Sequence, residues 1–208
     1  MIVIANKRMK PENILKRYPG AIIADVTSSA QDGLVKLSPF YPHGDIPVPN
    51  SPGVVSASVE AIWQGLKVFE QADVDTTLFA NRTMKGLKRT VRRFGNPLGH
   101  RFGVHGTELL GYIEARKRIY LPAYRWMLEH HCMHIIERLR EASKTKTIVL
   151  LDYDTNEEVD NPKAPLSHAF LVKAYAEGLY PFENAVAKPE EITAESQSAG
   201  TQLELNFE

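Results

Sequence analysis

Glu60 is a residue whose position suits acid–base chemistry. It belongs to the segment SVEAIWQGLK, residues 58–67, whose apolar residues recur at helical spacing and whose first residue, Ser58, is a favoured helix cap. The helix dipole stabilises a carboxylate in the first turn of such a helix. This carboxylate could stabilise a positive charge developing on a sugar or activate a water molecule. Alternatively, Glu60 only caps its own helix together with Ser58.

The neighbours of Glu60 offer groups that could hold a substrate. Gln64 and Lys67 follow Glu60 at i+4 and i+7, so a continuous helix would place them on nearly the same side. They could hold a sugar hydroxyl or a phosphate, although a solvated surface position explains Lys67 equally well. Phe40 and Tyr41, in the preceding segment LSPFYP, are expected to contact a ligand beside Glu60.

A basic segment lies downstream. Between Thr76 and Thr107 no acidic residue occurs. Residues 84–94 are predicted to form a helix, with a cationic face made of Lys85, Lys88, Arg89, Arg92 and Arg93. Together with the glycine-rich segment 95–106, a predicted loop, this face would bind phosphate. The phosphate-holding candidates are Lys67, Arg89, Arg92 and Arg101. The anion could be a pyrophosphate or a DNA backbone, and the alternative is a solvated helical face.

Metal and cofactor chemistry has little support in the sequence. His130 and His134, at i and i+4 in HHCMH, form half of a zinc site, but no third ligand is evident. We therefore expect neither a metal nor a cofactor. A phosphate-binding P-loop and a G-x-G-x-x-G segment after a strand are both missing from the sequence, which leaves Rossmann and kinase folds without support.

The predicted elements that must position these residues indicate an α+β fold. The chain has 208 residues, of which 43% are hydrophobic, enough for one core. Strands are predicted at 20–26 and 146–154, the second one buried. Helices are predicted at about 59–71, 84–94, 106–118, 121–144 and 165–177, and a proline-rich loop at 42–53. The fold expected is a mostly helical single domain with a small β-sheet. The predicted buried stripe of the longest helix is Leu121, Tyr124, Leu128, Cys132, Ile135 and Leu139.

Two of these segments resemble the NADAR family, N-glycosidases that include a hydrolase of riboflavin-pathway intermediates. The first resembles the family motif LSNFYP, and the second resembles S-x-E-H-Y-Y-Q-A-x-K-F about twenty residues later. The matching residues are Leu37, Ser38, Phe40, Tyr41, Pro42, Ser58, Glu60, Gln64, Lys67 and, displaced by one, Phe69. The sequence departs from the family at Pro39, Ala61 and Trp63, where the family has Asn, His and Tyr.

The resemblance implies a NADAR-like domain over residues 1–184 that hydrolyses an N-glycosidic bond in a nucleotide or in an ADP-ribosylated guanine or DNA base. Glu60 would be its main catalytic carboxylate. Tyr120, which stands where the family has Trp, would assist together with Asp154 or Asp160. We favour Asp160 because it lies after the predicted strand, in a loop entering the last helix. The pocket would be shaped by Phe40, Tyr41 and Trp63.

Two other functions remain open at this point. The protein could be a non-catalytic module that is recruited to the replication clamp and binds DNA through its basic segment. It could also be an enzyme of the same fold that installs a DNA base modification. Analysis of the reaction product would separate this last function from hydrolysis.

The last 24 residues differ in composition from the rest. Residues 185–208 contain five Glu, one Lys and many small residues, a composition typical of disorder. The final QLELNF resembles the motif with which bacterial polymerases and repair proteins bind the replication sliding clamp; its matching residues are Gln202, Leu203, Leu205 and Phe207. Such a tail would deliver a catalytic domain to replicating DNA. The alternative is a tail that folds back as an edge strand.

The remaining composition argues for a cytoplasmic protein without a membrane partner. The net charge is zero, and a single Cys excludes an intramolecular disulfide. No apolar run approaches the roughly 20 residues that span a bilayer. The opening MIVIANKRMK is too short for a signal peptide.

Overall fold

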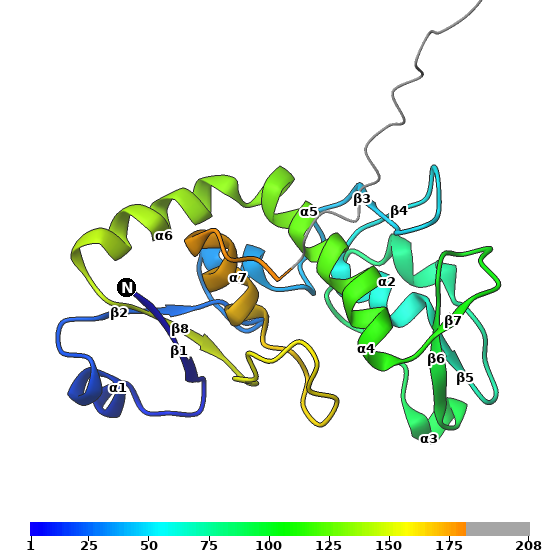
Figure 1. Ribbon diagram of the computed structural model, residues 1–208, viewed down its shortest axis with the longest axis horizontal. Helices are drawn as coiled ribbons and strands as arrows, with labels where there is room; N and C mark the ends of the chain where they lie inside the picture. The colour runs from blue at the N-terminus through cyan, green and yellow to red at the C-terminus, as the bar shows by residue number, and fades with distance from the viewer. Residues whose placement is uncertain (182–208) are drawn as a thin grey trace, which may run out of the picture.

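The computed structural model describes residues 1–181, which form one α+β domain with three small sheets (Figure 1). This confirms the predicted fold class. The elements in chain order are β1 (Ile2–Asn6), α1 (Pro11–Arg17), β2 (Ile22–Asp25), the 3-10 helix η1 (Gly33–Leu37), β3 (Ile46–Pro47), β4 (Val55–Ser56), α2 (Val59–Gly65), β5 (Lys67–Phe69), the 3-10 helix η2 (Thr76–Ala80), α3 (Val91–Phe94), β6 (Pro97–Arg101), β7 (Leu109–Leu110), α4 (Tyr112–Ala115), the π-helical turn η3 (Arg116–Tyr120), α5 (Leu121–His131), α6 (Met133–Thr145), β8 (Ile148–Asp152) and α7 (His168–Glu177).

Strands β1, β8 and β2 form a parallel sheet of three strands, in the order β1-β8-β2. All five residues of β8 are buried, as its continuous apolar sequence predicts for a central parallel strand. Ile14 of α1 packs with Ala5, Val149 and Leu151 in a small core of its own. Helices α6 and α7 cover one face of the sheet, and α1 covers the opposite face (Figure 1). The carboxyl ends of β2 and β8 point toward the remainder of the domain (Figure 1).

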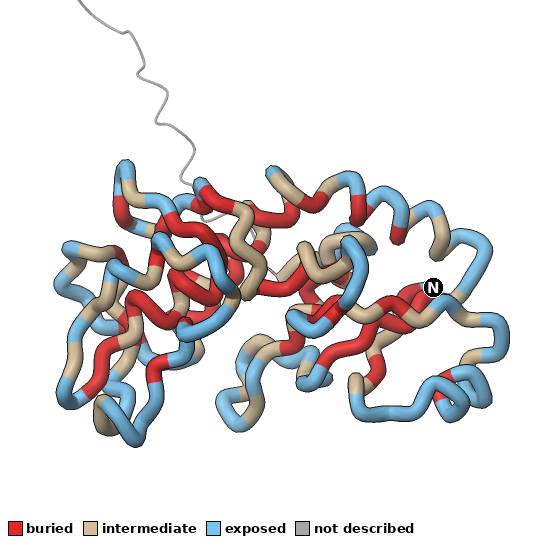
Figure 2. Tube along the Cα trace, turned by 180° about the vertical axis from the view of Figure 1, so that it is seen from behind, coloured by how far each residue is buried: buried red, intermediate tan, exposed pale blue. Residues whose placement is uncertain are grey.

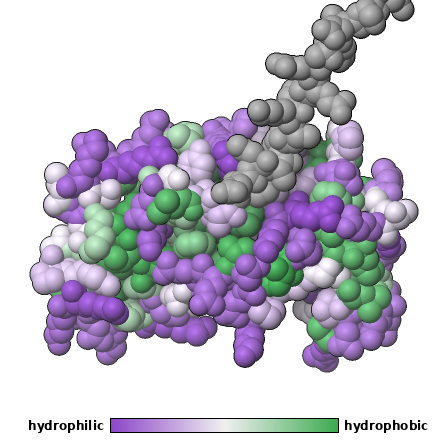
Figure 3. Space-filling model, viewed as in Figure 1, coloured by the Kyte–Doolittle hydropathy of each residue, from purple (hydrophilic) through white to green (hydrophobic). Residues whose placement is uncertain are grey.

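That remainder contains α2, α4 and two antiparallel sheets, β3-β4 and β5-β6-β7. Helix α5 joins it to the parallel sheet, and buried segments run through both halves (Figure 2). The hydroxyl of Tyr124, on α5, donates a 2.6 Å hydrogen bond to the carbonyl of Leu37. The predicted buried stripe is confirmed, since all six of its residues are buried. Hydrophilic side chains cover much of the face seen in Figure 3, with hydrophobic patches between them.

Three predicted helices are shorter than expected. The helix predicted at 106–118 begins only at Tyr112, because Leu109–Leu110 forms β7 and pairs with β6. Helix α2 ends at Gly65, where an added Cβ would lie 2.4 Å from the ring of Phe79. Lys67 consequently belongs to strand β5, which pairs with β6. The predicted helix 121–144 is divided into α5 and α6 at Cys132, which has a non-helical conformation.

The predicted basic helix at 84–94 is wrong, because only Val91–Phe94 forms a helix there. Met84 and Gly86 have positive φ angles of 58° and 70°, a left-handed conformation that interrupts a right-handed helix. Leu87 turns inward and is 1% exposed, so its neighbours do not share one helical face. The segment 95–106, a predicted loop, contains β6.

No helix within residues 1–181 is long and apolar enough to cross a bilayer.

Candidate active-site cleft

A cleft lies where the carboxyl ends of β2 and β8 meet α2. It consists of two adjoining cavities with volumes of about 400 Å³ and 410 Å³. Both cavities are lined by Phe40, Glu60, Lys88, Tyr120, Asp154 and Leu166. Residues separated by more than a hundred positions thus line one continuous space, and four of these six are predicted site residues.

Glu60 is held rigidly at the junction of the two cavities. Ser58 caps α2 by accepting a hydrogen bond from Ala61 N, and the backbone N–H of Glu60 donates to the carbonyl of Pro39 at 2.8 Å. The second contact places Phe40 beside the start of α2, as the sequence predicts. Glu60 is therefore not the capping side chain of its helix.

The Glu60 carboxyl has one oxygen free to react. Gln64 Nε2 donates to Glu60 Oε1 at 2.9 Å, whereas Oε2 accepts no hydrogen bond from the described residues. Burial raises the pKa of Glu60 above 4.5, while Gln64, Lys67 and Lys88 oppose part of this shift. The side chain is thus suited to carry a proton closer to neutral pH than an exposed glutamate does.

Tyr120 and Asp154 supply two further polar groups at the junction. Burial and the negative charge of Glu60 raise the pKa of Tyr120 well above 10, so its hydroxyl remains a neutral hydrogen-bond donor. Neither this hydroxyl nor the Asp154 carboxylate has a partner within residues 1–181. Both groups are therefore available to a ligand.

Aromatic rings and two lysines complete the walls. Trp63 contacts Tyr112 and Tyr120 edge to face, at ring-centroid distances of 5.8 Å and 5.7 Å. Lys88 Nζ lies 5.8 Å from the ring centroid of Phe40. Burial lowers the pKa of Lys67, although the charge of Glu60 opposes the shift. The cleft combines apolar stacking surfaces with positive charge, a composition suited to a nucleotide.

A family model for a family of unknown function, DUF6939, matches residues 6–172. The chain belongs to this family. The match covers every residue that lines the cleft. No curated protein matches the chain.

Two buried arginines of this DUF6939 domain hold the walls of the cleft in place. Arg89 donates to the backbone carbonyls of Gln64, Lys67 and Asp73. Arg116, 2% exposed, donates to four carbonyls between Glu158 and Ala164. Because these guanidinium groups are occupied by backbone, the prediction that Arg89 holds phosphate lacks support from the geometry.

Several other predicted site residues lie outside the cleft. Arg101 forms a bidentate ion pair with Asp73, and Arg92 is exposed on α3. Tyr41 does not line either cavity and lies 4.7 Å from the ring of His43.

The choice between the two aspartates is also corrected by the geometry. Asp160 forms an exposed ion pair with Lys117 at 2.6 Å and lines neither cavity of the cleft. Asp154 lies in both. Asp154 therefore replaces Asp160 as the favoured second carboxylate. The clamp-binding residues, Gln202, Leu203, Leu205 and Phe207, lie outside the described residues.

An ion pair that was not predicted from the sequence lies on the floor of the cleft. Asp152 Oδ2 lies 3.0 Å from His168 Nδ1 and also accepts hydrogen bonds from Ser167 Oγ and Ala169 N. Burial would raise the pKa of Asp152, but the hydrogen bonds from His168 and Ser167 outweigh burial and lower it. Because its oxygens are occupied, Asp152 positions the chain rather than reacting. The position of Asp152 at the carboxyl end of a buried strand was the available sequence signal.

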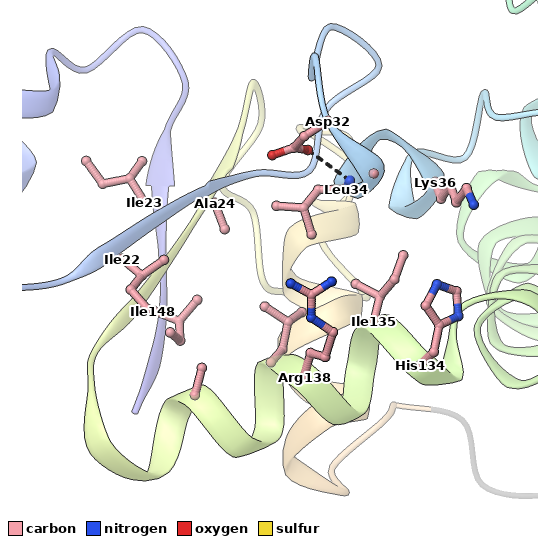
Figure 4. A pocket seen from close by; sticks show the side chains of 13 residues that line it. Ile22, Ile23, Ala24, Asp32, Leu34, Lys36, His134, Ile135, Arg138 and Ile148 are labelled. Atoms are coloured by element: carbon pink, nitrogen blue, oxygen red, sulfur yellow. Dashed lines mark hydrogen bonds between the residues drawn. The ribbon is translucent and has the colours of Figure 1, made fainter.

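A separate cavity of about 520 Å³ lies at the amino-terminal ends of β2 and β8. Figure 4 shows Arg138 of α6 reaching into it between the aliphatic side chains of Ile148, Leu34 and Ile135. It contains neither Glu60 nor any other predicted site residue.

Proposed function

We propose that this protein hydrolyses an N-glycosidic bond in a nucleotide or in an ADP-ribosylated guanine or DNA base. The observation that carries the proposal is the buried Glu60 carboxyl, which has a raised pKa, has one oxygen without a hydrogen bond from the described residues, and lines a cleft with aromatic walls. The resemblance of residues 37–69 to the NADAR N-glycosidases supports the same activity.

The reaction needs an acid, a group that stabilises positive charge, and a water molecule. Protonated Glu60 donates its proton to the leaving nitrogen of the base while the bond between C1′ and that nitrogen breaks. The Asp154 carboxylate stabilises the oxocarbenium-like sugar and accepts a proton from the attacking water as the new C1′–O bond forms. Transfer of one proton from Asp154 to solvent and uptake of one by Glu60 restore the starting state.

Other residues of the cleft bind and orient the substrate in this mechanism. Phe40 and Trp63 provide stacking surface for a base, and Lys67 and Lys88 attract phosphate. The Tyr120 hydroxyl donates a hydrogen bond to the sugar or base at the junction. Gln64 fixes the rotamer of Glu60, so that the proton is held toward the cleft.

Mass spectrometry of the products tests the proposal. Wild-type protein and Glu60→Gln are incubated with an ADP-ribosylated guanine oligonucleotide and with a panel of free nucleotides. Release of ADP-ribose or of a free base by the wild type, and not by Glu60→Gln, supports hydrolysis. Asp160→Asn is the matched control outside the cleft and should retain activity. Equal turnover by Glu60→Gln would disprove the role of this residue.

A second candidate function, non-catalytic DNA binding, is favoured by the exposed cations Arg82, Lys85, Lys88, Arg92 and Arg93. They lie within a stretch that lacks acidic residues. Salt-dependent binding to unmodified DNA with no product from any substrate would favour this function.

We also propose, from sequence, that residues 202–207 bind a replication sliding clamp. This binding would bring the cleft to replicating DNA in the cytoplasm. Co-migration of the full chain with a purified clamp, lost in Leu205→Ala/Phe207→Ala, would support it. Unchanged co-migration of the variant would contradict it.

A further inference from the structure

Two lobes of the cleft differ in the groups that line them. The first lobe, of about 400 Å³, adds Trp63, Gln64, Lys67, Tyr112, Arg116 and Pro165 to the shared residues. The second, of about 410 Å³, adds the hydroxyl groups of Thr27, Ser28, Ser38 and Tyr153, together with Asp152 and His168. The first lobe is therefore rich in aromatic rings, and the second in hydroxyl groups.

The aromatic lobe has a rigid stacking wall. The ring of His100 lies 3.8 Å from Trp63, on which it packs. Burial lowers the pKa of His100 to about 3, so this ring is neutral and supports the indole without adding charge. Tyr112 and Tyr120 contact the indole edge to face. A flat heteroaromatic ring gains stacking energy against such a fixed surface.

The hydroxyl-rich lobe contains fewer groups that are free to bind. Thr27 Oγ1 is hydrogen-bonded to Asp25 and Ser29, and Ser38 Oγ accepts from Phe40 N. Ser28 is exposed and has no hydrogen-bond partner among the described residues. Its hydroxyl and the Asp154 carboxylate at the junction are available to accept hydrogen bonds from a sugar diol, and Lys88 is available to a phosphate.

Glu60 and Tyr120 line both lobes, so a ligand that fills both must pass these two side chains. We infer that the cleft binds a nucleoside phosphate in one orientation, with its base in the lobe of Trp63 and its ribose in the lobe of Ser28 and Asp154. The glycosidic bond then lies at the junction beside Glu60. This inference rests on the proposed function for the reaction, but the two binding subsites are testable without turnover.

Fluorescence can separate the two lobes because the chain has two tryptophans. Trp126 lies outside the cleft, stacked on His130 at 4.0 Å, so Trp126→Phe leaves Trp63 as the reporter. In this background we expect adenine to quench the emission and ribose 5-phosphate to bind, by calorimetry, without comparable quenching. Quenching by ribose 5-phosphate equal to that by adenine would overturn the assignment.

Variants that alter only one lobe provide a second test of the inference. Ser28→Ala and Asp154→Asn should each weaken the binding of ribose 5-phosphate roughly five- to tenfold, which is the effect of one lost hydrogen bond, while the affinity for adenine stays unchanged. Trp63→Leu should weaken the binding of adenine and leave the affinity for ribose 5-phosphate unchanged. The reverse pattern, or no binding of either probe, would refute the inference.

The outcomes also distinguish this inference from the proposed function. Glu60-dependent hydrolysis with the lobes reversed would refute the orientation alone. Both probes binding as assigned, with no turnover of any nucleotide, would refute the hydrolase and retain the two subsites.

Discussion

The imidazole of His168 lies between the carboxylate of Asp152 and the backbone carbonyl of Val26. Its Nδ1 is 3.0 Å from Asp152 Oδ2, and its Nε2 is 2.8 Å from the carbonyl oxygen. Since both neighbours are acceptors, the ring satisfies both by carrying two protons. This imidazolium links β8, the end of β2 and the start of α7 beneath the cleft.

The charged His168 makes stability fall in alkaline solution. Burial would lower its pKa, but Asp152 and the Val26 carbonyl outweigh burial and raise it above 6.5. The stabilisation is fully present below pH 6.5 and is lost as the pH rises through the raised pKa. We expect the free energy of unfolding, measured with urea, to decline above this point.

His168→Gln tests the same ion pair. It should cost roughly 3–5 kcal/mol below neutral pH, because Asp152 is left buried without its counter-charge, and it should remove the alkaline decline. If the variant showed the same decline in stability with rising pH, the decline would belong to another group.

Asp152 itself contributes to stability at higher pH. Its contribution to the free energy of unfolding is fully present above pH 3.8 and is lost as the pH falls through its lowered pKa.

Hydrolysis should lose rate as the pH rises. Glu60 acts as an acid, so the protonated form is needed, and burial raises its pKa above 4.5. The rate at saturating substrate should therefore fall as the pH rises through this raised pKa. Glu60→Gln should lower turnover about 10²–10⁴-fold, and the remaining rate should no longer fall with rising pH. A rate that stays constant as the pH rises would argue against proton donation by Glu60.

Arg116 should be essential to the fold of the cleft. In Arg116→Gln, the carbonyls of Val159 and Asn161 lose their donor, whereas those of Glu158 and Ala164 keep a hydrogen bond from Asn156 Nδ2. We expect the free energy of unfolding to fall by about 2 kcal/mol or more, since each unsatisfied polar group costs about 1–3 kcal/mol when it is buried. Arg116→Lys should not restore the lost stability, because an ammonium group lacks the planar fork of donors of a guanidinium group.

Arg118→Gln is the matched control for Arg116. Arg118 is two residues away and pairs with Glu108 at the surface. Its loss should change stability by less than about 1 kcal/mol. Equal losses for the two variants would contradict the role of Arg116.

Variants in the basic segment should distinguish residues that could bind DNA from residues that stabilise the fold. Arg92→Ser/Arg93→Ser should leave unfolding within about 0.5 kcal/mol of wild type, because both side chains are exposed. If the segment binds DNA, the double variant should weaken binding and reduce its salt dependence. Arg89→Ser should instead destabilise the fold, since its guanidinium bonds to backbone carbonyls. Equal DNA affinity of wild type and double variant, measured by fluorescence anisotropy, would exclude a role for these two arginines.

Short-range relationships in this protein follow from sequence. The apolar run 148–152 became the central strand, because a strand buried on both faces needs apolar side chains throughout. Ser58 caps α2, and the i+4 spacing places Gln64 against Glu60. Each of these contacts spans only a few residues, so local geometry was enough to predict it.

The sequence by itself thus determined the α+β class, the buried stripe of α5 and α6, and the Glu60–Gln64 pair. Only the tertiary structure decided that Arg89 and Arg116 serve the backbone, that Asp154 rather than Asp160 lines the cleft, and that His168 pairs with Asp152. Helical and strand periodicity fix neighbours along one element. Contacts between distant segments depend instead on how elements pack, and burial then determines which charges remain free.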